Sequence, residues 1–170
     1  MISPESSFKK ILDEHAAMKG VYVLIIFTAI FGIVAGALVA GVTGIVFLPL
    51  LIAVIAVVWV LLGIFVWSGI SHIIAKFVFK GEGKFVNLFG LFGYTTVSFI
   101  LGIFGLMTLM LAGTVFSFLL LFGLMHLWVL IIATVAVHCE HKIGIGRSFL
   151  SCFGVPSLII IAIFLILEVL

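Results

Sequence analysis

The side chains best suited to chemistry in this chain stand together in the run His138-Cys139-Glu140-His141, and Cys152 follows a short distance beyond it. Imidazole, thiolate and carboxylate groups are common protein ligands of zinc, and His138 and His141 would share one face of a helix. The run is therefore a candidate metal centre. It also stands where a long uncharged stretch ends, and polar side chains collect at such places without needing an ion. We accordingly expect no bound metal and no cofactor, and we expect folding to tolerate alanine at both histidines.

The rest of the chain offers little further chemistry. His126 is the only histidine deep inside a long uncharged stretch. Its imidazole could face a pore or a metal, and the simpler interpretation is a neutral ring bonded to a nearby backbone group or hydroxyl. The sequence has no Gly-x-Ser-x-Gly elbow, no phosphate-binding glycine loop and no His-Glu-x-x-His motif. These observations favour a protein that is not an enzyme.

Three stretches contain no formally charged side chain: residues 20–75, 85–139 and 148–167. A helix needs roughly 20 apolar residues to cross a bilayer core about 30 Å thick. The first two stretches are therefore each long enough for two membrane spans, and the third is long enough for one. Hydrophobic residues make up 66% of the chain and charged residues only 8%, which excludes an ordinary soluble fold.

Glycine and proline divide the long stretches into helices. Residues 41–44 read Gly-Val-Thr-Gly and precede Pro49, which makes a natural turn, and residues 112–114 read Ala-Gly-Thr, which makes a softer one. We predict an all-α fold, a single domain over residues 1–170 built as a bundle of five transmembrane helices. The predicted spans follow a short segment of residues 1–20 and lie at about 21–41, 49–75, 86–111, 115–137 and 148–167.

All eight basic residues fall on one side of this layout. They stand before the first span, between the second and third spans, and between the fourth and fifth: Lys9, Lys10, Lys19; Lys76, Lys80, Lys84; Lys142, Arg147. Cytoplasmic loops concentrate lysine and arginine, so we predict the amino terminus inside and the carboxyl terminus outside. The protein would then be a multi-pass protein of the cell membrane. Three small basic clusters do not make the patch that nucleic acid requires, so we expect no nucleic-acid partner.

A ridge of small residues runs along the first predicted span at intervals of four: Gly32, Gly36, Ala40 and Gly44. Small residues let helices approach closely in lipid, where no hydrophobic effect drives helices together. We predict that this ridge packs against another helix. The simpler interpretation is packing within the chain, and the alternative is the seam of a homo-oligomer.

A short basic segment follows the second predicted span. Lys76, Lys80 and Lys84 recur at every fourth residue among phenylalanines, and Gly81 and Gly83 interrupt the helix before a full stripe forms. Such a segment suits the membrane surface, where each basic residue near anionic lipid headgroups adds about 1 kcal/mol of attraction. We predict that these lysines contact anionic headgroups.

The same segment carries a family resemblance. His72 at the end of a span, the loop glycines Gly81 and Gly83, and the pair Gly93-Tyr94 in the next span resemble the signature of the Yip domain family. These are Ypt/Rab-interacting membrane proteins with five spans, and this chain is similar to a compact prokaryotic or archaeal-type member. Family members commonly carry proline after Gly-Tyr, whereas residues 95–98 here read Thr-Thr-Val-Ser.

The resemblance implies a five-span fold and a role related to membrane trafficking. It also implies small GTPases or other membrane proteins as partners. Our main hypothesis is a non-enzymatic scaffold that organises membrane or recruits partners. The alternative is an oligomeric transporter or channel for a neutral or lipid-like substrate, which a polar pathway reaching His126 would favour. A third hypothesis is a metal-dependent membrane enzyme that uses His138, Glu140 and His141.

Overall fold

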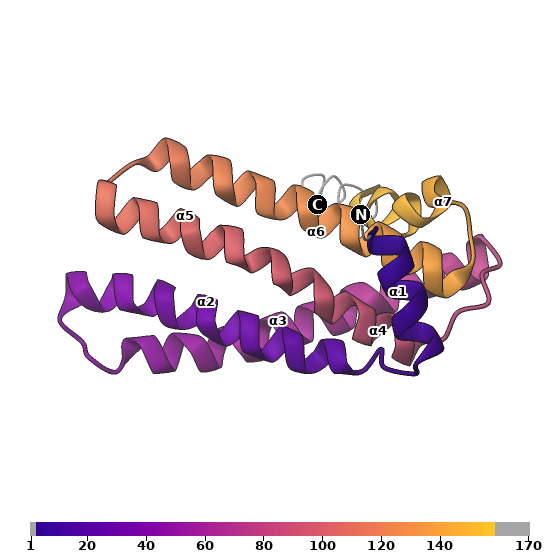
Figure 1. The fold of residues 1–170 in the computed structure, drawn as a ribbon, viewed down its shortest axis with the longest axis horizontal. Coiled ribbons are helices and arrows are strands. Elements are labelled where there is room, and N and C mark those ends of the chain that lie inside the picture. Colours follow the sequence, from indigo (N-terminus) through magenta and orange to yellow (C-terminus); the bar gives the residue numbers. More distant parts are fainter. Residues whose placement is uncertain (1–2, 159–170) are drawn as a thin grey trace, which may run out of the picture.

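The computed structural model describes residues 3–158, and over these residues the chain forms helices and no strand. The long helices are α2 (Lys19–Thr43), α3 (Leu48–Ile73), α5 (Phe99–Ala112) and α6 (Val115–His141). Figure 1 shows them as two antiparallel hairpins, α2 with α3 and α5 with α6. Three short helices gather at one end: α1 (Pro4–Asp13), α4 (Phe85–Gly93) and α7 (Ile145–Phe149).

Four of the five predicted spans are confirmed as helices long and apolar enough to cross a membrane: Lys19–Thr43, Leu48–Val78, Phe85–Ala112 and Val115–His141. The second extends α3 through a π-helical turn at Ile74–Val78, and the third joins α4 to α5 through a 3-10 turn at Tyr94–Ser98.

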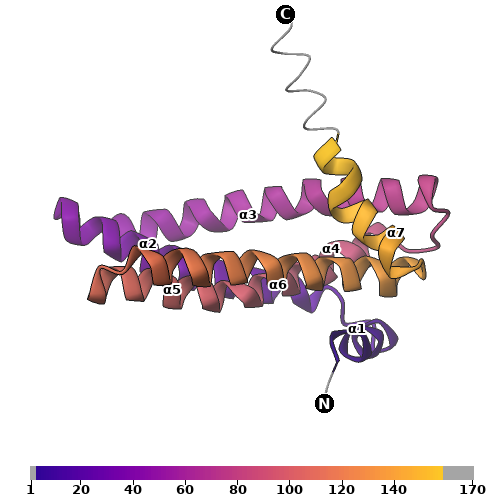
Figure 2. The same cartoon turned by 90° about the horizontal axis from the view of Figure 1, so that it is seen from above.

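The fifth predicted span, residues 148–167, lies partly outside the described residues. Its described part comprises the end of α7, a π-helical turn at Leu150–Gly154 and a helical turn to residue 158. Figure 2 shows this part crossing α3 instead of running alongside the four long helices. The indole Nε1 of Trp67 donates a 2.9 Å hydrogen bond to the carbonyl of Cys152, which fixes the π-helical turn to α3.

The two hairpin turns form where the sequence predicts them. Gly44 ends α2 with a φ of 75°, and its N–H bonds to the carbonyl of the half-buried Ala40 at 2.8 Å. Gly113 ends α5 with a φ of 62°, and its N–H bonds to the carbonyl of Leu109 at 3.1 Å. Glycine adopts this left-handed conformation without the steric cost that a side chain would add.

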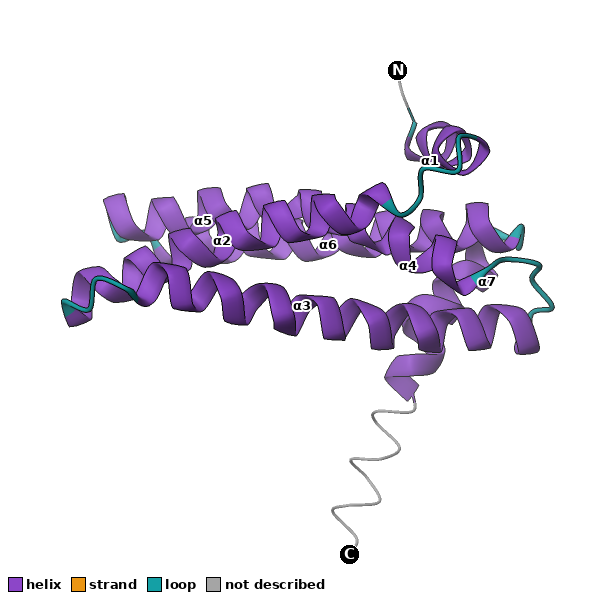
Figure 3. Ribbon diagram, turned by 90° about the horizontal axis from the view of Figure 1, so that it is seen from below, coloured by secondary structure: helices purple, strands orange, loops and turns teal. Residues whose placement is uncertain are grey.

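The helices form two unequal layers. Helices α2, α5 and α6 lie in one layer, and α3 lies to one side of it against α2 (Figure 2 and Figure 3). Helix α4 is the centre of the packing, because its side chains Leu88, Leu91 and Phe92 have no exposed surface. Farther along the hairpins large apolar side chains such as Trp59 and Phe116 are exposed, as lipid contact requires.

The stretch that replaces the expected proline changes the winding of the helix. Residues 94–98 wind as a 3-10 turn between α4 and α5. The hydroxyls of Thr95, Thr96 and Ser98 each donate to the carbonyl three residues earlier, at 2.6–2.7 Å. Hydroxyl side chains that bond to their own helix bend it locally. The chain therefore interrupts the regular α-helix at this place without a proline.

Helix α1 lies within the segment 1–20 and crosses the end of the bundle (Figure 1). Its amino end is capped by Ser3, whose Oγ accepts the N–H of Ser6 at 3.2 Å. Phe8 is 5% exposed and its ring faces that of Tyr94, with ring centroids 6.2 Å apart. The apolar face of α1 therefore fixes this helix across one end of the bundle. We call it the charged end, because the charged residues of the described chain lie there, in residues 5–19, 76–84 and 140–147.

The small-residue ridge packs α2 against α3 of the same chain. A Cβ added at Gly32 would lie 2.6 Å from Cα of Ala53, and one added at Gly36 would lie 2.5 Å from Cα of Pro49. Both distances are far shorter than ordinary van der Waals contact, so the helices touch backbone to backbone here. The predicted packing role does not extend to Gly44, because that residue ends the helix and a Cβ added there would meet nothing within 4 Å.

Replacing Gly36 with leucine should force α2 and α3 apart. We expect the free energy of unfolding in detergent to fall by about 1–3 kcal/mol, the usual cost of overpacking a close contact. Gly41→Leu is the matched control, because Gly41 is exposed and a Cβ added there meets nothing within 4 Å. Equal losses in the two variants would show that the ridge is not a packing surface.

Candidate functional site at the charged end of the bundle

The connection between α3 and α4 is a folded loop, residues 79–84, which we call the glycine loop. Lys80 has a φ of 57°, and the N–H of Gly81 bonds back to the carbonyl of Ala75 at 2.9 Å. These two features turn the chain back over the end of α3. The loop then crosses the end of α6 before Lys84 begins the approach to α4.

His141, the last residue of α6, is the centre of the loop's contacts. The residue is 1% exposed. Its Nδ1 accepts the N–H of Gly83 at 3.2 Å, and its carbonyl accepts the N–H of Glu82 at 3.3 Å. Its Nε2 lies 3.2 Å from Nδ1 of His72 on α3. One side chain thus joins the glycine loop, α6 and α3.

These bonds fix where the protons of the two neutral rings lie. Because Nδ1 of His141 accepts the N–H of Gly83, the proton of that ring must be on Nε2. This Nε2–H then donates to Nδ1 of His72, whose own proton must be on its Nε2. The pair is a chain of two hydrogen bonds in one direction, from Gly83 through His141 to His72.

Glu140 holds the other end of the glycine loop. Its Oε1 accepts the backbone N–H of Lys84 at 2.6 Å and the side-chain N–H of Asn87 at 3.3 Å. The first N–H groups of a helix have no partner within the helix, and negative charge is favourable near them. Lys84 directly precedes α4, and Glu140 is 8% exposed. Helix α4 is therefore capped by a carboxylate that α6 supplies.

The two loop glycines allow this close approach. A Cβ added at Gly81 would lie 2.8 Å from Cβ of His141. A Cβ added at Gly83 would lie 2.8 Å from Nδ1 of His141 and 2.9 Å from Cγ of Glu140. Any larger residue at either position must push the loop off the end of α6.

The remaining residues of the predicted signature, Gly93 and Tyr94, make a second contact. Gly93 and the nearby Gly90, both on α4, lie against the backbone of residues 17–21, where α2 begins. The ring of Tyr94 covers Gly20, because a Cβ added there would be 2.8 Å from two ring carbons. His72, Gly81 and Gly83 thus meet at His141, whereas Gly93 and Tyr94 attach the amino-terminal segment to α4.

The side chains of the three lysines in the basic segment take no part in these hydrogen bonds. Lys76, Lys80 and Lys84 are exposed, and no ion pair found within residues 3–158 includes them. In contrast, Lys9 on α1 lies 2.6 Å from Glu5, and this hydrogen bond and the ammonium charge lower the pKa of Glu5. The three lysines therefore remain able to meet anions outside the protein.

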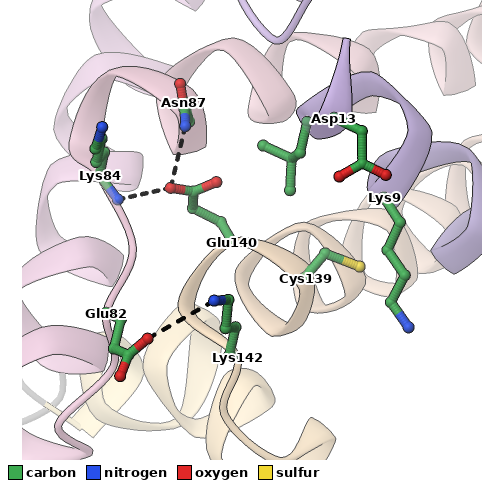
Figure 4. Close-up of a pocket in the computed structure, with 9 residues that line it drawn as sticks. Lys9, Asp13, Glu82, Lys84, Asn87, Cys139, Glu140 and Lys142 are labelled. Atoms are coloured by element: carbon green, nitrogen blue, oxygen red, sulfur yellow. Dashed lines mark hydrogen bonds and ion pairs between the residues drawn. The ribbon is translucent and has the colours of Figure 1, made fainter. Parts of the chain in front are cut away.

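An open groove of about 490 Å³ separates α1 from the glycine loop and the end of α6 (Figure 4). It is lined by residues of all three: Lys9, Leu12, Asp13, Glu82, Lys84, Asn87, Cys139, Glu140 and Lys142. Figure 4 shows Glu140 reaching across to Lys84 and Asn87, and Glu82 pairing with Lys142 at 3.7 Å. Charged side chains of both signs line this groove, so it could bind a partner surface that carries both signs of charge.

The side chains of the candidate metal run point in different directions. His138 pairs through Nδ1 with the carbonyl of Ile143 at 2.5 Å, whereas Glu140 and His141 hold the glycine loop. Within residues 3–158, no three His, Cys, Asp or Glu side chains come together as metal ligands. A metal on Nε2 of His141 would also require a proton on Nδ1, toward which the N–H of Gly83 already points.

His141 is more than a polar residue that collects at the end of an uncharged stretch. Its ring is buried and makes two hydrogen bonds, so alanine at this position would leave partners unpaired. The expectation that folding tolerates alanine at both histidines does not fit this environment. Sequence analysis missed the role of Glu140 and His141 because their partners come from a loop distant in the chain.

His126 lies on the outer surface of α6. Its Nδ1 is 2.8 Å from the carbonyl of Phe122, one turn earlier in the same helix. This confirms a ring bonded to nearby backbone. Because the residue is exposed, it does not face the interior of the bundle. The polar pathway that would favour a transporter is not found at this histidine.

Comparison with known proteins gives one match. The family model of the Yip1 domain matches residues 1–167, which is nearly the whole chain. No curated protein and no solved structure matches the chain.

Replacing Gly83 with alanine should detach the glycine loop from α6. The new Cβ would displace the ring of His141, and the N–H of residue 83 would lose its buried acceptor. We expect the free energy of unfolding in detergent to fall by about 1–3 kcal/mol. Gly146→Ala is the control, because a Cβ there meets nothing within 4 Å. Wild-type stability in Gly83→Ala would contradict the described contact.

Proposed function

The chain belongs to the Yip1 domain family, and from this membership we propose that it is a non-enzymatic scaffold that organises one membrane face and recruits partners there. The observation that carries the proposal is the placement of charge. Within residues 3–158 every Asp, Glu, Lys and Arg lies in residues 5–19, which comprise α1 and the approach to α2, around the glycine loop, or around the connection from α6 to α7. The opposite turns, at residues 44–47 and 113–114, have none.

We propose that the charged end faces the cytoplasm, because cytoplasmic loops are enriched in lysine and arginine. The protein would then cross the cell membrane five times, with its amino terminus inside and its carboxyl terminus outside. Helix α1 would lie along the inner surface, since its apolar face packs on the bundle, whereas its Lys9 and Lys10 pair with Glu5 and Glu14.

The glycine loop would present this end of the bundle to anionic headgroups. Lys76, Lys80 and Lys84 are exposed and have no acidic partner among the described residues, so their charge is available to lipid. The bonds from Glu140 and His141 keep the loop in one conformation. Lys80 and Lys84 are exposed on the loop, and Lys76 is exposed just before it. A fixed array of cations loses little conformational entropy when it binds a charged surface.

Partner recruitment would use the groove between α1 and the glycine loop. Its volume of about 490 Å³ and its charges of both signs suit a polar segment of another protein. The family resemblance suggests a small GTPase or another membrane protein in this place and a role related to membrane trafficking. No described feature favours a transporter, because His126 faces outward from the bundle.

The lysine surface can be tested with the triple variant Lys76→Gln, Lys80→Gln, Lys84→Gln. In vesicles of mixed lipid, spin-labelled anionic and zwitterionic lipids report which headgroup the protein prefers. We expect the preference for anionic lipid to fall by up to about 1 kcal/mol for each lysine removed. Lys10→Gln is the control, because this lysine on α1 lies 3.9 Å from Glu14. An unchanged preference in the triple variant would rule out headgroup binding by the loop.

A further inference from the structure

We propose that His72 and His141 form a proton-operated latch on the glycine loop. While both rings are neutral, they hold the loop against the end of α6. When the surrounding face becomes acidic, proton uptake by the pair releases the loop. The latch itself rests on the geometry of the two rings, and its consequence for lipid contact rests on the proposed function.

Both accepting nitrogens of the histidine pair are already occupied. A neutral imidazole has one nitrogen that accepts and one that donates. In this pair the accepting nitrogen of His141 is occupied by the N–H of Gly83 at 3.2 Å, and that of His72 is occupied by His141 at 3.2 Å. Neither ring has a free nitrogen for another proton. Proton uptake must therefore break one of these two bonds.

An added proton can bind at Nδ1 of either histidine, and each position disturbs the pair. On Nδ1 of His141 it would point at the N–H of Gly83, so two donors would face each other and the loop would be pushed away. On Nδ1 of His72 it would face the Nε2–H of His141, and the two rings, with centroids 4.9 Å apart, would be forced to separate. Either event disturbs the ring that supports the loop.

The charges around the pair do not favour proton uptake. Lys76, on the π-helical turn after α3, stands four residues after His72, and its positive charge opposes proton uptake there. From α6, Glu140 carries a negative charge, but its Oε1 is engaged by the N–H of Lys84. Glu82, in the loop, pairs with Lys142 at 3.7 Å. The local charges therefore do not supply a partner for a protonated His141.

The glycine loop covers the ring of His141, so a charged ring can reach water only if the loop moves. His141 is 1% exposed because Gly81 and Gly83 lie directly on its ring. A charged imidazole needs water or a charged partner, and burying it without one is costly. Water can reach the ring when the glycine loop lifts. Release would leave a positive charge on the histidine pair beside the exposed lysines, which should strengthen contact with anionic headgroups.

The latch can be tested with a nitroxide attached at Glu82→Cys in the full chain, after both native cysteines are replaced by alanine. The electron paramagnetic resonance line shape reports loop mobility in detergent, where no lipid takes part. We expect an immobile label at about pH 7.5 and a mobile label at about pH 3.5, well below the ordinary titration of histidine, because the burial of His141 and the charge of Lys76 oppose proton uptake. The change should reverse when the pH is raised again. Equal mobility at the two values would overturn the latch.

Matched variants assign the response to particular rings. Asparagine in His141→Asn offers an oxygen that accepts the N–H of Gly83 but takes up no proton, so the label should stay immobile at both pH values. His72→Asn leaves Nδ1 of His141 able to take up a proton, so the label should still become mobile at the lower pH. His138→Asn, one turn earlier on α6, is the control and should respond as the wild type does. A response that persists in His141→Asn, or disappears in His138→Asn, would overturn the proposal.

Lipid measurements at both pH values separate this latch from the proposed function. A mobility change without any effect on anionic-lipid preference supports the latch and contradicts a headgroup role for the loop. Constant mobility, with a preference that still depends on the lysines, overturns the latch and leaves the headgroup role intact. A mobility change accompanied by a stronger anionic preference at low pH supports both.

Discussion

The absence of hydrogen-bonding partners in lipid is the constraint on which the rest of this structure depends. A membrane helix satisfies its own backbone, whereas irregular backbone must find partners in the protein or in water. The far turns meet this constraint by being short, with a glycine closing the last turn of each helix. At the charged end the longer glycine loop meets it with side chains, because His141 and Glu140 accept the N–H groups of Gly83 and Lys84.

This arrangement links the fold to the properties of the charged end. Helix α4 is the most buried element, and it is capped by Glu140 from α6 and covered by the segment that begins α2. The loop before it is therefore held on a rigid base while its lysines stay exposed. The charge pattern, the groove beside α1 and the histidine pair are consequences of bringing distant parts of the chain to one end.

The long helices and the turns between them could be predicted from the sequence, because the composition of each segment decides them. Uncharged length predicts the four long helices, and glycine predicts the turns that Gly44 and Gly113 close. The directions of Glu140 and His141 could not be predicted, since residue type alone suits a metal as well as a loop. The Ser-Pro-Glu start of α1, from residue 3, was an available signal for that helix. The crossing of α3 by the described part of the fifth predicted span depends on tertiary contacts of Trp67.

The charged residues among residues 3–158 gather at one end, and labelling of sealed cells tests most directly the proposal that this end is cytoplasmic. Single cysteines would be introduced as Val46→Cys, Glu82→Cys and Gly144→Cys in a chain lacking Cys139 and Cys152, then exposed to a membrane-impermeant thiol reagent. The account predicts that position 46 is labelled in intact cells. Positions 82 and 144 should be labelled only after the membrane is permeabilised. Labelling of position 82 in intact cells would contradict the account.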